Sequence, residues 1–191
     1  MSVRVGQGFD IHRFSDDTSR RLVLGGVEFT GERGLVGHSD ADVIAHAAAD
    51  ALLGAAGLGD IGQHFPDTDR RWHGANSLAL LSEVARMVRA AGCEPGNVDC
   101  AVVCERPKLA PQREAIEANL TAAVGAPVTI KGNRAEGLGS LGRVEGIACW
   151  AVAVVESGAQ LRPATESTTA ARDRVRRYFR IGQSPQPGAS V

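Results

Sequence analysis

The residues best suited to chemistry gather in one stretch of the sequence, residues 37–69. It holds three of the five histidines of the chain, interspersed with six aspartates: His38, His46, His64, Asp40, Asp42, Asp50, Asp60, Asp67 and Asp69. Imidazole nitrogens and carboxylate oxygens bind zinc in proteins, and carboxylates also suit Mg²⁺. A helix that served packing alone would not need so many ionisable groups. The stretch therefore indicates half of a metal and phosphate site, with the other half supplied elsewhere in the chain.

Within this stretch, Asp42, His46 and Asp50 stand four residues apart and would form one stripe along a helix. The stripe has two interpretations. In the first it is a solvated helix face. In the second one ring nitrogen of His46 binds a cation while an acid accepts the N–H of the other nitrogen and fixes the tautomer. The spacing alone leaves both open.

A second candidate is the triplet Asp10-Ile11-His12, which follows an expected strand over residues 2–9. Side chains two residues apart share one face of an extended chain, so Asp10 and His12 would point the same way. Two ligands at this spacing can hold one metal ion. The alternative is an ordinary polar strand end.

The helices and strands that must position these residues are predicted from hydrophobic periodicity and from the glycine, proline and capping residues that end each element. Helices are expected from Ser39, as N-cap with Asp42 in a capping box, to Gly54 or Gly57, and over residues 77–91 and 111–124. Strands are expected over residues 2–9, 21–29, 98–105, 127–131 and 146–156, and residues 58–69 form a loop.

This order of elements predicts an α+β fold, a mixed sheet with helices packed on one face. The strand at 21–29 contains Gly25-Gly26, which suggests a bulge or tight bend. The strand at 146–156 is apolar at nearly every position, so we expect burial on both of its sides. Since the chain offers no further helices for the second face, self-association through the sheets follows.

The amino-acid composition limits the classes of protein to which this chain can belong. The chain has 191 residues, 43% of them hydrophobic and 23% charged, with a net charge of −1. Such a balance gives no electrostatic reason to expect a nucleic-acid partner. Neither a membrane-length apolar run nor a signal-peptide core is apparent, and the four cysteines form no CxxC pair, so a cytoplasmic location is expected. We expect one domain over residues 1–157 and a polar tail over 158–191, with a short basic helix capped by Thr169.

Taken together, the motifs resemble one family, the 2-C-methyl-D-erythritol 2,4-cyclodiphosphate synthases of the non-mevalonate isoprenoid pathway. The resemblance spans residues 3–156. It rests on an ordered set of segments: GFDIH at 8–12, GHSDADVIAH at 37–46, DALLGAAGLGDIGQHFPDTD at 50–69, NVD at 97–99, RPK at 106–108, EGLG at 136–139 and GRVEGIA at 142–148.

The resemblance implies a phosphorus–oxygen lyase that works as a homotrimer with active sites between neighbouring subunits. The 2-phosphate of 4-diphosphocytidyl-2-C-methyl-D-erythritol 2-phosphate would attack the β-phosphorus of its own diphosphate, and CMP would leave. By the match, Asp10, His12 and His46 bind one zinc per subunit, and Glu136 holds Mg²⁺ or Mn²⁺. His38 and Glu136 would act in catalysis, and Asp42 and Asp50 would support the ligands.

The resemblance also implies the residues that line the substrate. Phosphate contacts fall on His38 and Ser39 at the start of the expected helix, where free N–H groups favour an anion. The full set of substrate-binding residues comprises Asp10, His12, His38, Ser39, Asp60, Ile61, Gly62, Phe65, Pro66, Asp67, Thr68, Asp69, Pro107, Lys108, Leu109, Ala110, Asn133, Arg134, Ala135, Glu136 and Arg143.

Two departures from the family pattern matter. Asn133-Arg134-Ala135 replaces three threonines before Glu136, and Arg134 would supply charge in place of the missing hydroxyls. Ser140 replaces a phenylalanine that lines the central cavity of the trimer, so the isoprenoid diphosphate that can bind there in the family is an open question here.

Two other functions share the same ligands. One is a zinc phosphohydrolase that activates water, against which stands the lack of a clear further acid as general base. The other is a non-catalytic trimeric module stabilised by zinc, against which stands the presence of Glu136 beside intact zinc ligands.

Overall fold

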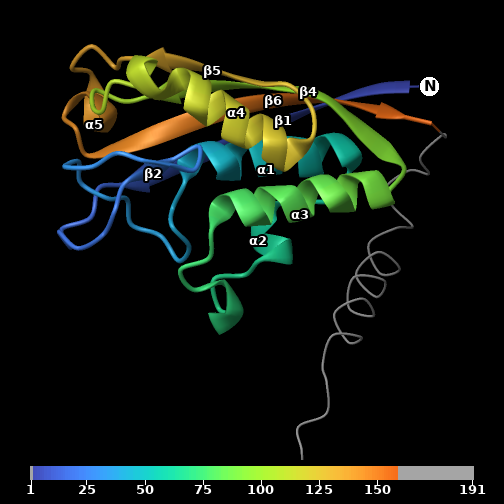
Figure 1. The fold of residues 1–191 in the computed structure, drawn as a ribbon, viewed down its shortest axis with the longest axis horizontal. Helices are drawn as coiled ribbons and strands as arrows, with labels where there is room; N and C mark the ends of the chain where they lie inside the picture. The colour runs from blue at the N-terminus through green and yellow to red at the C-terminus, as the bar shows by residue number, and fades with distance from the viewer. Residues whose placement is uncertain (1, 159–191) are drawn as a thin grey trace, which may run out of the picture. The chain divides into compact units, whose positions relative to one another are not determined.

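The computed structural model describes residues 2–158 (Figure 1). The strands are β1 (Ser2–Arg13), β2 (Val23–Leu24), β3 (Val27–Glu28), β4 (Cys93–Val103), β5 (Val128–Asn133) and β6 (Gly146–Ser157). The helices are α1 (Val43–Ala56), α2 (Ile61–His64), α3 (Ser77–Ala90), α4 (Arg113–Val124) and α5 (Gly139–Gly142), with 3₁₀ turns at Arg70–Trp72 and Ala110–Gln112. The expected basic helix of the tail lies outside the described residues. None of the helices in the described part combines the length and apolar character needed to cross a membrane.

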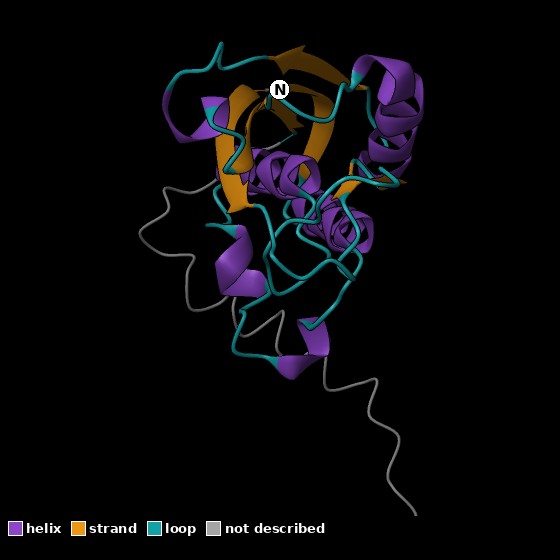
Figure 2. Cartoon of the chain, turned by 90° about the vertical axis from the view of Figure 1, so that its left-hand side faces the viewer, coloured by secondary structure: helices purple, strands orange, loops and turns teal. Residues whose placement is uncertain are grey.

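Four strands form one mixed sheet in the order β1-β6-β4-β5. The pairs β1–β6 and β6–β4 are antiparallel, and β4–β5 is parallel. Helix α1 packs against β1 and β6, and α3 and α4 extend the helical layer (Figure 2). The predicted α+β class with helices on one face of a mixed sheet is therefore confirmed.

Helix α1 lies unusually close to β1 because two residues of the strand have no side chain. A Cβ added to Gly6 would stand 2.0 Å from the carbonyl oxygen of Ala51, and one added to Gly8 would stand 2.0 Å from that of Ala47. Both distances are far below van der Waals contact, so only glycine permits this approach. The same face of β1 continues through Asp10 and His12, which brings those side chains against α1.

The other face of the sheet is rich in exposed apolar side chains. It carries Val3, Val5, Phe9 and Ile11 on β1 and Trp150 and Val152 on β6. The expected burial of β6 on both sides requires self-association and stays a prediction. In the single chain, Trp150 and Val152 on its second side are 38% and 45% exposed. The physical reason is that no helix of the described chain reaches this face.

Two local expectations need correction. The single strand expected over residues 21–29 is two short paired strands, β2 and β3. Of the two alternatives at Gly25-Gly26, the tight bend is confirmed, because both glycines take positive φ (55° and 72°), as a type I′ turn requires. The loop expected over 58–69 contains the short helix α2, which Asp60 caps by accepting from the N–H of Gln63 at 3.0 Å.

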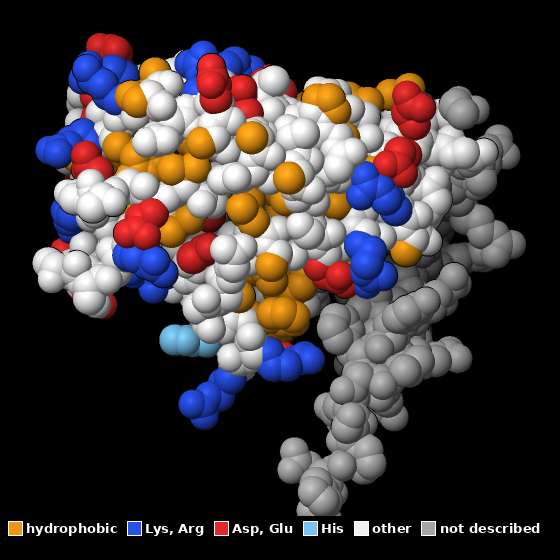
Figure 3. Space-filling view, viewed as in Figure 1, with side chains coloured by type: hydrophobic (Ala, Val, Ile, Leu, Met, Phe, Trp, Pro, Cys, Tyr) orange, Lys and Arg blue, Asp and Glu red, His pale blue; other side chains and the backbone are white. Residues whose placement is uncertain are grey.

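The surface agrees with the small net charge. Basic and acidic side chains are interspersed across the face seen in Figure 3, with apolar side chains between them. This mixture gives that face no field of one sign for steering a polyanion.

Candidate metal and phosphate site

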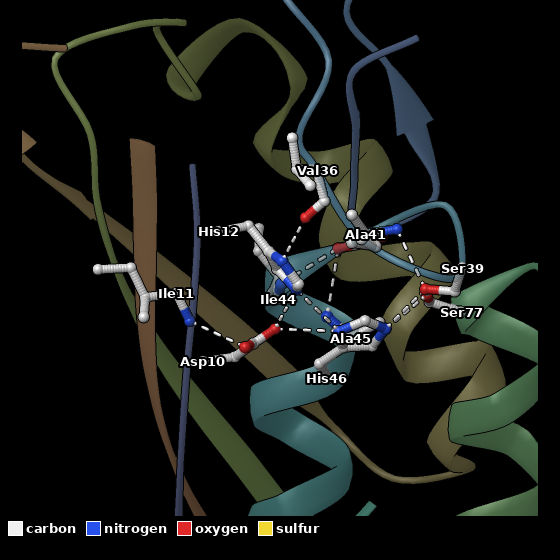
Figure 4. Close-up of polar contacts among 12 residues, drawn as sticks. Asp10, Ile11, His12, Val36, Ser39, Ala41, Ile44, Ala45, His46 and Ser77 are labelled. Carbon is white, nitrogen blue, oxygen red and sulfur yellow. Dashed lines mark hydrogen bonds and ion pairs between the residues drawn. The ribbon is translucent and has the colours of Figure 1, made fainter. Parts of the chain in front are cut away.

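Three side chains from two elements converge on one point beside the start of α1 (Figure 4). Asp10 Oδ2 lies 2.9 Å from His12 Nε2 and 3.0 Å from His46 Nδ1, and the two nitrogens are 3.4 Å apart. Of the described residues, these three form the group of acidic, histidine or cysteine side chains placed to hold one metal ion. The predicted shared face of Asp10 and His12 is confirmed, and His46 on α1 completes the metal triad.

His12 is oriented by the backbone of the loop before α1. Its Nδ1 lies 2.7 Å from the carbonyl oxygen of Val36. A carbonyl only accepts, so Nδ1 carries the proton and Nε2 keeps a lone pair. That lone pair faces Asp10 and His46, where a metal would sit.

His46 is oriented by a relay of hydroxyl and carboxylate groups. Its Nε2 lies 2.9 Å from Ser77 Oγ and 3.1 Å from Ser39 Oγ. The hydroxyl of Ser77 donates to Asp40, so Ser77 can accept the Nε2–H of His46. The Nδ1 lone pair of His46 therefore points into the metal triad. Fixing a ligand's tautomer through its other nitrogen is typical of metal-binding histidines.

Asp40 and Arg20 hold the loop before α1 and the start of α3 in place around the two histidines. Asp40 Oδ2 accepts the backbone N–H of Ser77 at 3.0 Å, which ties the start of α3 to the loop. The guanidinium of Arg20 donates to the carbonyl oxygens of Leu35, of Gly37 at 2.9 Å and of Ser39 at 2.6 Å. The loop that carries Val36, His38 and Ser39 is thus fixed by one side chain.

The sequence analysis missed Val36, Asp40, Ser77 and Arg20. Asp40 lay inside the stretch already singled out. Ser77 and Arg20 carried no signal of their own, since their contacts join segments between 15 and 37 residues apart. Only the packing of the chain brings them to the site.

The expected roles of Asp42 and Ser39 need correction. The N-cap of α1 is Asp42, whose Oδ1 accepts from the N–H groups of Ile44 and Ala45, both at 3.2 Å. Its Oδ2 accepts from Gly26 at 2.7 Å, and burial raises its pKa. Asp42 thus ties the β2–β3 turn to α1.

Asp50 serves the neighbouring loop. Its Oδ1 accepts the N–H of Ile61 at 2.7 Å. Burial raises the pKa of this carboxyl. Within residues 2–158, no side-chain hydrogen bond joins Asp42 or Asp50 to His46, although the carbonyl oxygen of Asp42 accepts the backbone N–H of His46 at 3.0 Å. A supporting role of the two acids at the ligand stays a prediction. The ring N–H of His46 goes to serine hydroxyls because the acids of the stripe face the backbone.

The triad is electrostatically coupled. Without a metal, a proton can take the place of the metal between a ring nitrogen and the carboxylate. Burial alone would raise the pKa of Asp10, but hydrogen bonds from His12 and His46 in this protonated form outweigh burial and hold the pKa far below its usual range. Burial would lower the pKa of His46, but the hydrogen bond with Asp10 raises it. Asp10 is therefore an anion at neutral pH, the form that binds a metal.

The donor set fits a divalent metal ion. With bonds of about 2.0–2.1 Å, the ligand atoms of a tetrahedral zinc stand about 3.3 Å apart. The three measured separations of 2.9, 3.0 and 3.4 Å bracket that value. Two imidazoles and one carboxylate leave a fourth position open, as in catalytic sites.

Next to the triad lie the expected phosphate and sugar contacts. His38 Nε2 lies 3.3 Å from the carbonyl oxygen of Asp69, so His38 contacts the end of the 58–69 loop. In that loop Phe65 packs edge-to-face on Trp72, with ring centroids 5.0 Å apart. The structure thus brings Ser39 to His46 of the triad and places His38 against the end of the 58–69 loop.

The remaining expected contacts lie elsewhere. Residues 107–110 follow β4, and residues 134–136 follow β5. β1, β4 and β5 run in the same direction, so all three end at one end of the sheet. β1 and β5 stand at opposite edges, however, three strand spacings or about 14 Å apart along the sheet. Within one chain, the strand order therefore separates β1, which carries Asp10 and His12, from β5, which Glu136 follows.

The family is shown by comparison with known proteins. The model of the YgbB family matches residues 3–156. A 2-C-methyl-D-erythritol 2,4-cyclodiphosphate synthase from Salinibacter ruber is 49% identical over 81% of this chain and 99% of its own length. One from Rubrobacter xylanophilus is 54% identical over 80% of this chain and 94% of its own. The chain belongs to the YgbB family.

The similarity to some relatives covers only part of their length. A bifunctional enzyme IspD/IspF from Anaeromyxobacter sp. (strain Fw109-5) is 56% identical over 156 residues, which is 80% of this chain but only 40% of that enzyme. This chain thus spans less than half of the bifunctional relatives it matches. Among solved structures, an IspF–CDP complex from Plasmodium falciparum matches with a TM-score of 0.71 at 32% identity, over 82% of this chain and 97% of that one.

Proposed function

We propose that this chain converts 4-diphosphocytidyl-2-C-methyl-D-erythritol 2-phosphate to 2-C-methyl-D-erythritol 2,4-cyclodiphosphate with release of CMP. The observation that carries the proposal is the metal triad, in which both imidazoles direct a lone pair at one point beside Ser39 in the loop before α1. Membership of the YgbB family and the CDP complex of a related IspF support the same activity.

The reaction is an internal phosphoryl transfer. An oxygen of the 2-phosphate forms a bond to the β-phosphorus, and the bond from the β-phosphorus to the oxygen it shares with the α-phosphorus breaks. CMP leaves with that electron pair. The attacking phosphate is already ionised, so no general base is needed. The protein's task is positioning and charge stabilisation.

Each part of that task falls to residues of this chain. Asp10, His12 and His46 would hold zinc, which supplies a Lewis acid for a phosphate oxygen. His38 and Ser39 bind phosphate at the loop before α1. The 58–69 loop orients the erythritol and excludes water, through Asp60 to Gly62 and Phe65 to Asp69.

The nucleotide side is assigned to the ends of β4 and β5. Pro107 to Ala110 would surround the cytidine, and Asn133 to Ala135 with Arg143 would contact the diphosphate side. Glu136 is an exposed single carboxylate. It fits Mg²⁺ or Mn²⁺, which proteins hold through one or two carboxylates together with substrate phosphates.

A homotrimer is part of the proposal, because the site is incomplete in one chain. The two phosphates of a diphosphate share one bridging oxygen, so cations bound to them must be far closer than the separation of about 14 Å that three strand spacings give. A second copy can supply the nucleotide side. The exposed apolar face of β1 and β6, where Phe9 and Trp150 stack with centroids 4.8 Å apart, is suited to bury itself between copies.

Two expectations remain predictions. An isoprenoid diphosphate in the centre of the trimer would have to bind beside Ser140 rather than a phenylalanine. A cytoplasmic location follows from the sequence argument alone.

The experiment is turnover of the cytidine substrate followed by phosphorus NMR, with and without a chelator. A cyclic diphosphate and CMP, lost on chelation, support the synthase. Release of inorganic phosphate would instead support a hydrolase that uses the same triad.

The trimer is tested by sedimentation of the full-length chain. Wild type should sediment at three times the chain mass, and Trp150→Glu should dissociate it and abolish turnover while each chain stays folded. A wild-type protein that is fully active as a monomer would overturn the shared site.

A further inference from the structure

The loop that carries Glu136 is built around the carboxylate of Glu105. Glu105 follows β4, and its side chain is only 8% exposed. Arg134 Nε and Nη2 donate to Glu105 Oε2 at 2.9 and 2.7 Å. The backbone N–H of Gly137 donates to Glu105 Oε1 at 3.2 Å, and that of Ala135 also faces the carboxylate. One anion thus holds the chain before and after Glu136.

Glu136 needs such support. Its φ is 51°, in the left-handed region that residues with a Cβ rarely adopt. Such a conformation costs free energy and persists only where the surroundings impose it. The two residues that flank Glu136 both turn their N–H groups to Glu105. The hydrogen bond of Gly137 fixes the peptide unit after Glu136, and that of Ala135 fixes the peptide unit before Ala135. The Ala135 carbonyl oxygen accepts the N–H of Leu138 at 2.9 Å and closes a tight turn over Glu136 and Gly137. Glu105 thus anchors this turn, and with it the direction in which the Glu136 side chain leaves the backbone.

A nearby ion pair serves as comparison. Asp99 and Lys131 also join β4 to β5, and Thr129 donates to the same carboxylate at 3.0 Å. The side chains of Asp99 and Lys131 are 39% and 58% exposed. Unlike Glu105, Asp99 lies within a strand whose backbone the ladder already fixes. Its ion pair is an ordinary surface contact between strands.

We propose that Glu105 and Arg134 are positioning residues for Glu136, which they hold in its left-handed conformation for binding a divalent cation at the diphosphate. This inference rests on the proposed function in taking Glu136 as the ligand of Mg²⁺ or Mn²⁺. It also gives Arg134, which replaces a threonine of the family pattern, a task within its own chain. Two nitrogens of its guanidinium, Nε and Nη2, donate to Glu105.

The first test needs neither metal nor substrate. In the full-length, metal-free protein, hydrogen exchange of the Gly137 amide is measured by NMR. Glu105→Ala should speed this exchange about tenfold, as expected for the loss of a charged acceptor. Glu105→Gln keeps an acceptor oxygen and should fall between Glu105→Ala and wild type. Lys131→Met, which breaks the comparison pair, should leave the Gly137 amide unchanged.

The second test measures Mn²⁺ affinity. Electron paramagnetic resonance follows Mn²⁺ bound in the presence of CDP. Arg134→Met and Glu105→Gln should weaken that binding about three- to tenfold, the effect of losing one or two hydrogen bonds that fix the loop. Arg134→Lys, which keeps the charge but not the forked donor, should restore part of it. The zinc content should not change in any variant.

The outcomes separate the inference from the proposed function. The positioning role would be overturned by one combination of results. Both Glu105 variants would keep the wild-type rate of Gly137 amide exchange and the wild-type Mn²⁺ affinity, while CMP release by the wild-type enzyme depends on Mn²⁺. A wild-type protein that releases no CMP with any divalent cation would overturn the proposed function, while amide exchange still decides whether Glu105 holds the loop. If Glu105→Ala does not fold, Arg134→Met carries the same test.

Discussion

The two halves of the site are constructed differently. At the metal triad, each histidine has one ring nitrogen occupied by a protein acceptor, and the ligands lie between β1 and α1, which packing holds together. At the ends of β4 and β5, Lys108, Arg134 and Glu136 are exposed. There, the carboxylate of Glu105 accepts hydrogen bonds from Arg134 and Gly137, on either side of Glu136.

This difference indicates a division of labour. The metal triad is complete within one chain, so a metal can bind without large rearrangement. The nucleotide side has its residues in place along an open edge, and its binding surface is completed by ligand and by a second copy in the proposed trimer. Variants on the two sides should therefore fail in different measurements: metal content on one side, nucleotide and Mn²⁺ binding on the other.

The largest effect is expected from removing a ligand of the triad. His46→Ala should abolish stoichiometric zinc and lower CMP release by about three orders of magnitude, since a metal that polarises phosphate supplies several kcal/mol. Metal analysis and turnover measure the two effects. His64→Ala, whose ring contacts the carbonyl oxygen of Leu58 at 2.8 Å, should keep the zinc. Stoichiometric zinc in His46→Ala would remove His46 from the ligand set.

Next comes the close packing that sets the distance between β1 and α1. Gly8→Ala should destabilise the fold by about 3 kcal/mol, since the added methyl meets the carbonyl oxygen of Ala47. It should also weaken zinc binding, because His46 moves away from Asp10. Gly54→Ala, in α1, has 3.8 Å to its nearest neighbour and should stabilise by about 0.5 kcal/mol. Denaturant titration measures both, and equal stabilities would refute the packing argument.

Much of this half of the site was predictable from the sequence. The period of two in a strand places Asp10 and His12 on one face, and hydrophobic periodicity places the helices on one side of the sheet. The ordered motifs then unite Asp10, His12 and His46, and the structure confirms that these side chains converge.

The errors have local physical causes. Ser39 and Asp42 are both good N-caps three residues apart, and the sequence does not tell which one takes the extended backbone. In the structure Ala41 has φ of 59° and Asp42 has ψ of 93°, so the helix begins after Asp42. Gly25-Gly26 is compatible with a bulge or a hairpin, and only the pairing partner decides. The hydroxyl relay from His46 to Asp40 depends on where α3 packs, which periodicity does not determine.

That relay gives the third prediction. Ser77→Ala should weaken zinc binding about 10- to 100-fold, the usual cost of losing a group that orients a ligand. Ser39 remains within 3.1 Å of the same nitrogen and limits the loss. Zinc affinity is measured by competition with a chelator. Ser82→Ala, an exposed serine of α3 that bonds to Leu78, is the matched control. Equal affinities of the two variants would mean that the relay does not orient His46.

The smallest effect is expected at Arg20, because it acts on the half that holds the metal triad only through the backbone of the loop before α1. Arg20→Met leaves three carbonyl oxygens without their shared donor, so the loop that carries Val36, His38 and Ser39 loosens. Each lost hydrogen bond is worth about 0.5–1.5 kcal/mol, but water replaces part of that, so we expect KM to rise about three- to tenfold. Affinity for CMP, which we propose binds at the ends of β4 and β5, should stay unchanged.

The control for Arg20 is its neighbour in the sequence. Arg21 pairs with Glu28 at 3.0 Å, and its side chain is 73% exposed. Arg21→Met removes the same charge and the same number of atoms without touching the loop, so its KM should equal that of wild type. If both variants raise KM equally, the effect is one of charge rather than loop order. If Arg20→Met weakens CMP as strongly as substrate, the two halves are coupled, and the separation drawn between them is wrong.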